Sequence, residues 1–414
     1  MKIKPIIIIT LIACFLLSCA DSNRGKVTLP DIDISNSPNG IVPLPDNTPS
    51  IIRDVFVKYT KIIAPNGKPI HFLATEDWTE NKLMKVRNVM EYMLTDFPDS
   101  EYGGDKTVVA NTMADRKATM TLFNSSTNAR EVREGPFGSK TDLFKQSMWA
   151  NEITCEGEDD YMNHITRDAA YEEVWHLVHE AGVKSVLREF QVEIEAAKDA
   201  AVAIGWGPPN DDPYSWHSEY YAQQLDNYLD LWVVQPKVWE GRELEPGEMP
   251  EGTAHWGQNQ VNSRGELKEL DPVGYELVEK FFRPYLTYTP QLPVDFKGTF
   301  SLEFDESLVY THKSQHLKDV ILRGENNANL IGNAYDNVFK GNAGDNVFRG
   351  GKGEDIIDGG EGNDTAVFSG SESDYTVTRD DVRVVVKDKQ INRDGEDSLT
   401  NIEILQFKNR KIKL

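Results

Sequence analysis

The sequence predicts an α+β domain followed by an all-β domain built from short repeats. Between residues 51 and 283, strand-like stretches come first and amphipathic helical stretches follow, which is typical of an α+β layout rather than an alternating α/β one. From residue 324 onward, a glycine-containing unit recurs about every nine residues, which is typical of a repeat architecture. A proline-bearing segment, residues 284–293, marks the expected boundary between the two domains.

The bulk composition is that of an acidic globular protein. The chain has 414 residues, of which 39% are hydrophobic and 27% are charged, so it is long enough for more than one hydrophobic core. Its net charge of −23 excludes a nucleic-acid-binding surface, because such a surface needs a basic patch. The acidity instead favours an extracytoplasmic protein that binds divalent cations.

Residues 1–18 have the pattern of a targeting signal. Lys2 and Lys4 precede an apolar run, Ile6–Leu17, that is too short to span a bilayer comfortably. The run ends in Leu-Leu-Ser-Cys at Cys19, which resembles the lipobox of bacterial lipoproteins. The resemblance implies cleavage before Cys19, lipidation of its sulfur and stable anchoring to an outer-membrane or cell surface. An ordinary secretory signal is the alternative.

Two further features follow from the N-terminal half. Cys14 leaves with the signal and Cys19 is lipidated, so Cys155 stands alone and no intrachain disulfide is available. Any cross-link between distant parts of the chain must therefore come from bound metal ions. Residues 19–50 are rich in Pro, Asn, Ser and Asp, and this composition predicts a flexible tether.

The domain over residues 51–283 is expected to contain both strands and helices. Hydrophobic periodicity and turn residues predict strands at residues 55–63, 70–74, 107–110, 118–123 and 143–153. The same criteria predict helices at residues 79–94, 169–182, 186–204, 216–233 and 271–282.

The C-terminal repeats carry a calcium-binding pattern. Residues 350–358 fit G-G-x-G-x-D-x-U-x, and the repeats resemble those of the RTX calcium-binding family. The resemblance implies a parallel β-roll over residues 323–414, with residues 284–322 as a linker and the strands that lead into it. Glycines allow tight turns, and carbonyl and carboxylate oxygens are the ligands that Ca²⁺ prefers. The expected calcium-binding residues are Asn337, Asn346, Gly351, Gly353, Asp355, Gly360, Gly362 and Asp364.

The first repeats depart from the family pattern. Asn329, Asn337 and Asn346 stand where Asp355 and Asp364 stand later. Asparagine keeps an oxygen ligand but loses the negative charge, so weaker calcium sites are expected at this end. The closing strands, at residues 375–378, 382–386 and 402–407, are expected to cap the roll.

The helix at residues 169–182 carries metal-ligand residue types on one face. Glu172, His176 and His179 lie together, opposite an apolar face that includes Val174 and Leu177. Histidine and glutamate are ligands for zinc. The same face would also suit a solvated helix of an acidic protein.

Two short motifs resemble a metallopeptidase. Residues 172–176 resemble the zincin helix H-E-x-x-H with Glu172 in place of the first histidine, a degenerate EExxH. The resemblance implies that Glu172 and His176 bind zinc and that Glu173 activates water. Residues 218–222 resemble the E-[FY]-[FY]-A helix of lethal-factor-like gluzincins, which implies Glu219 as the third ligand. The domain over residues 51–283 is thus expected to be zincin-like.

The departure from the motif leaves alternatives open. A Glu/His/Glu set is more anionic than a typical zinc site and would also suit Mn²⁺. A second ligand set would combine His176 with His179 or Glu180, with or without His217.

The sequence therefore predicts a membrane-anchored, calcium-binding lipoprotein with a zinc-dependent peptidase domain that acts on peptides or proteins. The alternative is a non-catalytic, calcium-dependent surface or adhesion lipoprotein on a degenerate zincin scaffold.

Overall fold

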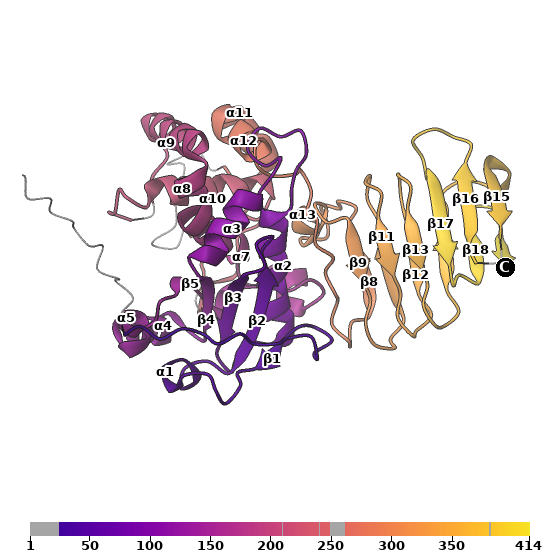
Figure 1. The fold of residues 1–414 in the computed structure, drawn as a ribbon. Coiled ribbons are helices and arrows are strands. Elements are labelled where there is room, and N and C mark those ends of the chain that lie inside the picture. The colour runs from indigo at the N-terminus through magenta and orange to yellow at the C-terminus, as the bar shows by residue number, and fades with distance from the viewer. Residues whose placement is uncertain (1–24, 209, 240, 249–260, 381) are drawn as a thin grey trace, which may run out of the picture.

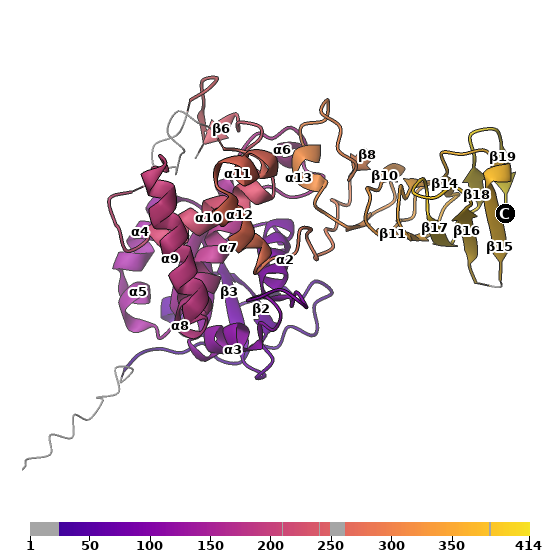
Figure 2. The same cartoon turned by 90° about the horizontal axis from the view of Figure 1, so that it is seen from above.

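The structure is a computed structural model that describes residues 25–208, 210–239, 241–248, 261–380 and 382–414. A mixed α/β part lies beside a narrow stack of strands, which extends away from it in both views (Figures 1 and 2). The predicted signal, residues 1–18, and Cys19 lie outside the described residues. No helix among the described residues is long and apolar enough to cross a membrane.

The α/β part is built on a five-stranded mixed sheet with the strand order β1-β2-β3-β4-β5. Its first three strands pair antiparallel, whereas β3, β4 and β5 pair parallel. Every residue of β4 is buried, so the sheet is covered on both faces. The strands are β1 Val42–Pro43, β2 Lys58–Ile63, β3 Pro69–Ala74, β4 Ala118–Phe123 and β5 Phe144–Trp149.

Helix α7 (Ala170–Val178) is the central helix of this part. It packs against strand β5 and against helices α2 and α10. Its apolar face is fully buried, with Val174 and Leu177 at 0% exposure. The remaining helices are α1 Ser50–Arg53, α2 Glu80–Leu94, α3 Thr107–Asp115, α4 Ser126–Glu134, α5 Pro136–Lys140, α6 Asp159–Met162, α8 Lys184–Val186, α9 Arg188–Ala203, α10 Trp216–Tyr228, α11 Arg264–Leu270, α12 Pro272–Glu279 and α13 Thr311–Ser314. A small hairpin joins β6 Val238–Trp239 to β7 Arg242–Glu243.

The strand predicted at residues 107–110 is wrong, because these residues begin helix α3. The amide of Thr107 donates to Asp105 Oδ1, which satisfies one free donor at the helix start. Val109 and Met113, one turn apart, are buried against the core. Packing of this helical face therefore outweighs the strand preference of two consecutive valines.

The flexible tether predicted for residues 19–50 is wrong from residue 25 onward. Leu29, Ile32 and Leu44 are buried in a cluster that also contains Phe56. A backbone amide of Val27 donates to the Lys140 carbonyl at 2.7 Å. Regularly spaced apolar side chains thus fasten a proline-rich segment along the sheet, although its composition is typical of a linker.

The helix predicted at residues 169–182 does not end at Gly182. After α7 the chain widens into a π-helical turn, His179–Val183, and continues as α8. A Cβ at Gly182 would lie 2.8 Å from Val109 Cγ1, so the glycine allows close packing against α3. His179 is fully buried, so the solvated-face interpretation is wrong for this residue.

The C-terminal part consists of two six-stranded sheets that face each other (Figure 1). From β8 to β15 successive strands alternate between the sheets, and most pairs are parallel, such as Val338↔Ile356 and Asn329↔Val347. Leu330, Phe339 and Phe348 fill the narrow core between them. The strands are β8 Gly298–Ser301, β9 Asp319–Ile321, β10 Ala328–Ile331, β11 Val338–Lys340, β12 Val347–Arg349, β13 Ile356–Asp358, β14 Thr365–Val367, β15 Tyr375–Arg379, β16 Val384–Asp388, β17 Glu396–Thr400, β18 Ile404–Gln406 and β19 Lys411–Lys413.

The parallel stack is longer than the repeats alone predict. Strands β8 and β9, which precede the repeats, already pair in parallel with β10 and β11. After the repeats, β17 and β18 pair in parallel with β13 and β14. The strand predicted at residues 402–407 therefore continues the stack, and only β15, β16 and β19 add antiparallel capping strands.

Candidate metal centres

Helices α7 and α10 bring Glu172, His176 and Glu219 together. One potential ligand atom from each residue lies within 4.8 Å of the other two. His176 Nε2 lies 3.5 Å from Glu219 Oε2 and 4.0 Å from Glu172 Oε1. The three residues that the zincin resemblance implies as ligands thus form one cluster, although 43 residues separate His176 from Glu219 in the sequence.

The orientation of His176 leaves one ring nitrogen for a cation. Its Nδ1 lies 2.8 Å from Ser218 Oγ, so Nε2 faces the two carboxylates. Burial lowers the pKa of His176, but the carboxylates of Glu219, Glu173 and Glu172 outweigh it and raise the pKa to about 9. The three carboxylates therefore favour a positive charge on or beside the His176 ring. A zinc or manganese ion fits the donor set of one imidazole and two carboxylates.

Glu172 also takes part in an ion pair. Arg167 Nη1 donates to Glu172 Oε2 at 2.5 Å, and Arg167 Nη2 donates to Glu152 Oε2 at 3.1 Å. The guanidinium carbon of Arg167 lies 4.4 Å from the ring centre of Trp239. Arg167 thus holds one oxygen of Glu172 and leaves Oε1 directed toward His176.

Glu173 lies next to the cluster, and a hydrogen bond from the sheet fixes its carboxylate. Gln146, on strand β5, donates its amide hydrogen to Glu173 Oε2 at 2.6 Å. Burial and the charges of Glu152 and Glu172 raise the pKa of Glu173 to about 8. A carboxylate with a raised pKa is suited to accept and return a proton near neutral pH.

A second cluster contains His179, Glu180 and His217. Its ligand atoms also lie within 4.8 Å of one another. Burial lowers the pKa of His179, so the neutral imidazole is favoured. The alternative ligand set proposed from the sequence mixed these residues with His176, whereas the described residues form two separate groups.

In the roll, the predicted calcium-binding side chains form ladders from one turn to the next. The backbone amide of Asn337 donates to Asp355 Oδ1 at 2.8 Å, and the backbone amide of Asn346 donates to Asp364 Oδ1 at 2.7 Å. All four side chains are buried. Among the described residues, Oδ2 of Asp355 and of Asp364 have no hydrogen-bond partner. Burial raises the pKa of both aspartates to about 7, because the charged carboxylate is disfavoured away from water.

The predicted glycines shape the turns between these strands. Gly351, Gly353, Gly360 and Gly362 have φ values of 101°, 115°, 92° and 120°, a region that other residues rarely adopt. A Cβ at Gly360 would lie 2.3 Å from the carbonyl oxygen of Asn342 on the preceding turn. The glycines therefore allow backbone oxygens of adjacent turns to approach one another.

Two acidic residues extend the ladders beyond the predicted set. The amide of Asp355 donates to Asp397 Oδ1 at 3.3 Å, and the amide of Asp364 donates to Glu403 Oε2 at 2.7 Å. Burial and the charge of Asp355 raise the pKa of Asp397 to about 9. The nine-residue period does not reach these residues, because strands β15 and β16 interrupt it. Glu403 falls within the strand predicted at residues 402–407, whereas no strand is predicted at Asp397, which lies on β17.

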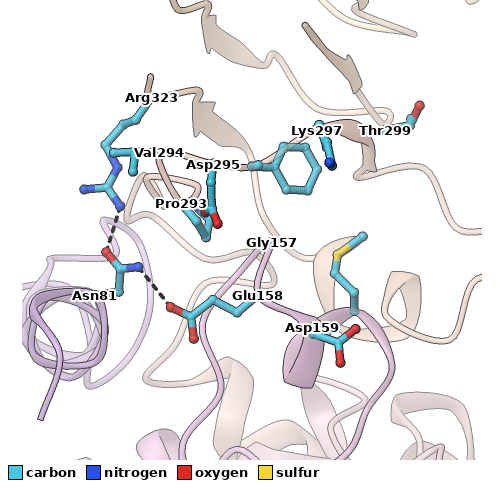
Figure 3. Close-up of a pocket in the computed structure, with 12 residues that line it drawn as sticks. Asn81, Gly157, Glu158, Asp159, Pro293, Val294, Asp295, Lys297, Thr299 and Arg323 are labelled. Carbon is cyan, nitrogen blue, oxygen red and sulfur yellow. Dashed lines mark hydrogen bonds between the residues drawn. The ribbon is translucent and has the colours of Figure 1, made fainter. Parts of the chain in front are cut away.

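A pocket of about 660 Å³ lies where the two parts meet, away from both histidine clusters. Arg323, just before the repeats, donates to Asn81 Oδ1 at 2.7 Å, and Asn81 donates to Glu158 Oε1 at 2.9 Å (Figure 3). These bonds connect helix α2 to the start of the roll. Polar side chains that line the pocket thus hold the α/β part and the roll together.

Comparisons with known proteins identify the repeats. A family profile described as the RTX calcium-binding nonapeptide repeat matches residues 331–366, with four copies. The C-terminal part therefore contains RTX repeats that bind Ca²⁺, a type of repeat typical of secreted, extracellular proteins. The match covers the repeats and not the α/β part.

The other comparisons add little. No curated protein matches the chain. Among solved structures, the chain is similar to the extracellular lipase LipA from Serratia marcescens, at 10% identity and a TM-score of 0.26. The match covers 84% of this chain and 54% of the lipase, so this chain spans about half the length of that protein. A TM-score this low defines no shared fold.

Proposed function

We propose that the chain is an extracytoplasmic, calcium-stabilised metallopeptidase of the gluzincin type. The observation that carries the proposal is the convergence of Glu172 and His176 on α7 with Glu219 on α10, next to the partly buried carboxylate of Glu173. The RTX repeats bind calcium and support an extracellular setting. Anchoring through a lipid on Cys19 is part of the proposal and rests on the lipobox-like sequence.

The residues of the cluster take separate roles in this proposal. Glu172, His176 and Glu219 would hold the metal ion, which would supply a Lewis acid to the site. Glu173 would act as the general base that accepts a proton from water and returns it to the leaving amine. Ser218 fixes the ring of His176, and Gln146 fixes the carboxylate of Glu173.

A peptide substrate is supported by the neighbouring strand. Strand β5 is the last strand of the sheet, and no other described strand pairs with its outer edge. An extended peptide could add to such an edge through backbone hydrogen bonds. Gln146 lies on this strand, so a peptide bound there would lie near Glu173.

Substitution of Glu173 tests the proposal. The full chain is saturated with calcium and zinc, and hydrolysis of fluorescein-labelled casein is measured. Glu173→Gln keeps the shape of the side chain but removes the base, so hydrolysis should fall roughly 100-fold or more while bound zinc is unchanged. Glu134→Gln, an exposed position on α4, is the matched control. Wild-type protein without hydrolysis, or a Glu173→Gln variant with full hydrolysis, would refute the proposal.

One observation favours the non-catalytic alternative, a calcium-dependent surface or adhesion protein. Arg167 already neutralises Glu172, the residue that replaces the first histidine of the motif. A permanent cation beside the site weakens binding of a second one. If the wild-type chain takes up no metal at Glu172, His176 and Glu219 under zinc excess, this alternative replaces the peptidase.

A further inference from the structure

The second histidine cluster has a geometry of its own. His179 and Glu180 lie in the π-helical turn after α7, and His217 lies in the first turn of α10. His179 Nδ1 and His217 Nε2 each lie 3.4 Å from the same atom, Oε1 of Glu180. π-Helical turns are rare and are frequently found at functional sites.

The tautomer of His179 follows from its neighbours. Gln191 donates its amide hydrogen to Glu195 Oε1 at 2.7 Å, so its carbonyl oxygen faces the histidine. That oxygen lies 2.7 Å from His179 Nε2, which must therefore carry the ring hydrogen. In a neutral imidazole the other nitrogen, Nδ1, then presents a lone pair toward Glu180.

Among the described residues, neither of these two nitrogens has a partner other than Glu180. His179 Nδ1 and His217 Nε2 are buried and make no hydrogen bond among the described residues, and the residues are 0% and 8% exposed. Buried nitrogen lone pairs that face a carboxylate are unfavourable unless a proton or a metal cation lies between them. Ligands about 2.0–2.1 Å from a tetrahedral zinc ion lie roughly 3.3 Å from one another. The observed separations of 3.4 Å match that spacing.

We propose that His179, Glu180 and His217 form a second transition-metal site, best suited to zinc and separate from Glu172, His176 and Glu219. Two imidazoles and one carboxylate leave a fourth position for water. The Glu180 side chain is 36% exposed, so the ion exchanges with solvent. Lys184 Nζ, at 2.9 and 3.0 Å from the two oxygens of Glu180, orients the carboxylate but, as Arg167 does at Glu172, also offsets part of its charge.

The site has a structural role. The ion links the end of α7 to the start of α10. These two helices carry the ligands of the first cluster, so the second ion fixes their relative position. Gln191 acts as a positioning residue, because it selects the tautomer of His179. Gln191→Ala should weaken zinc binding at this site roughly 10- to 100-fold, as loss of outer hydrogen bonds does at other zinc sites.

Metal counting on the full chain tests the inference. Protein saturated with calcium is stripped of transition metals with a chelating resin and dialysed against zinc, and bound zinc is measured by mass spectrometry. His217→Gln and Glu180→Gln should each bind one zinc ion fewer than the wild type. His176→Gln should keep the zinc that those two variants lose. His312→Gln, a partly buried histidine on α13, is the control and should bind as the wild type does.

The outcomes separate this inference from the proposed function. If His217→Gln and Glu180→Gln bind as much zinc as the wild type, the second site is refuted. If His176→Gln removes all zinc, it is also refuted. If the wild type binds one ion that only His217→Gln and Glu180→Gln remove, the second site stands and the proposed peptidase site falls. Should His217→Gln fail to fold, Glu180→Gln decides, because its side chain is partly exposed.

Discussion

Replacing Lys85 by methionine should lower the free energy of unfolding of the α/β part by about 3–5 kcal/mol. Lys85 Nζ forms an ion pair with Glu156, lies 3.5 Å from Asp168 Oδ2 and donates to Tyr288 Oη at 2.6 Å. Burial lowers the pKa of Lys85, but the nearby carboxylates outweigh it and raise the pKa well above its usual value. Lys85 and both carboxylate side chains are at most 6% exposed. Methionine would leave the two carboxylates buried without the ion pairs that Lys85 provides.

Tryptophan fluorescence during urea unfolding in excess calcium measures this effect. All eight tryptophans lie between residues 78 and 256, so the signal reports the α/β part and not the roll. The urea midpoint of Lys85→Met should fall by about 1 M or more. Lys68→Met is the control, because Lys68 forms an exposed ion pair worth less than about 1 kcal/mol. If both variants lose the same small amount, the interpretation of Lys85 as the centre of a buried network is wrong.

Two further predictions concern calcium and pH. Chelation of calcium should abolish the strand signal of the roll in circular dichroism, while tryptophan fluorescence stays native. The reason is that calcium ions compensate the charges of Asp355 and Asp364. A roll that keeps its strand signal after chelation would contradict this prediction. Burial lowers the pKa of Lys106 to about 7, so between about pH 7 and 10 the unfolded chain binds more protons than the folded chain. The contribution of Lys106 to stability should therefore rise with pH across this window, by up to about 4 kcal/mol, and urea unfolding measured at each pH should show the wild type gaining stability relative to Lys106→Met as the pH rises.

The roll was the part of the fold that the sequence predicts best. Its period places Phe339, Phe348 and Ile357 at equivalent positions, and all three are buried in the core. Helix α2 was equally clear, since Thr79 caps it by accepting from the Lys82 amide. Such features are local, so a short stretch of sequence contains all the information needed.

Features that depend on distant contacts were not predictable. Val108 and Val109 favour a strand locally, but their helix is selected by packing against the core. The burial of Leu29, Ile32 and Leu44 depends on side chains far along the chain, such as Phe123 and Phe137. His217 lies 38 residues after His179, with no motif to join them, so only the crossing of α7 and α10 brings their rings 5.1 Å apart.

The interruption of the roll by β15 and β16 has a consequence for the order of folding. Ladder bonds within the repeats join residues 18 apart, whereas those to Asp397 and Glu403 span 42 and 39 residues. Closing the longer loop costs about 0.7 kcal/mol more entropy, so the last turn should form after the others. Until it does, β13 and β14 offer unpaired edges to another copy of the chain. Self-association during refolding should therefore begin at this end of the roll.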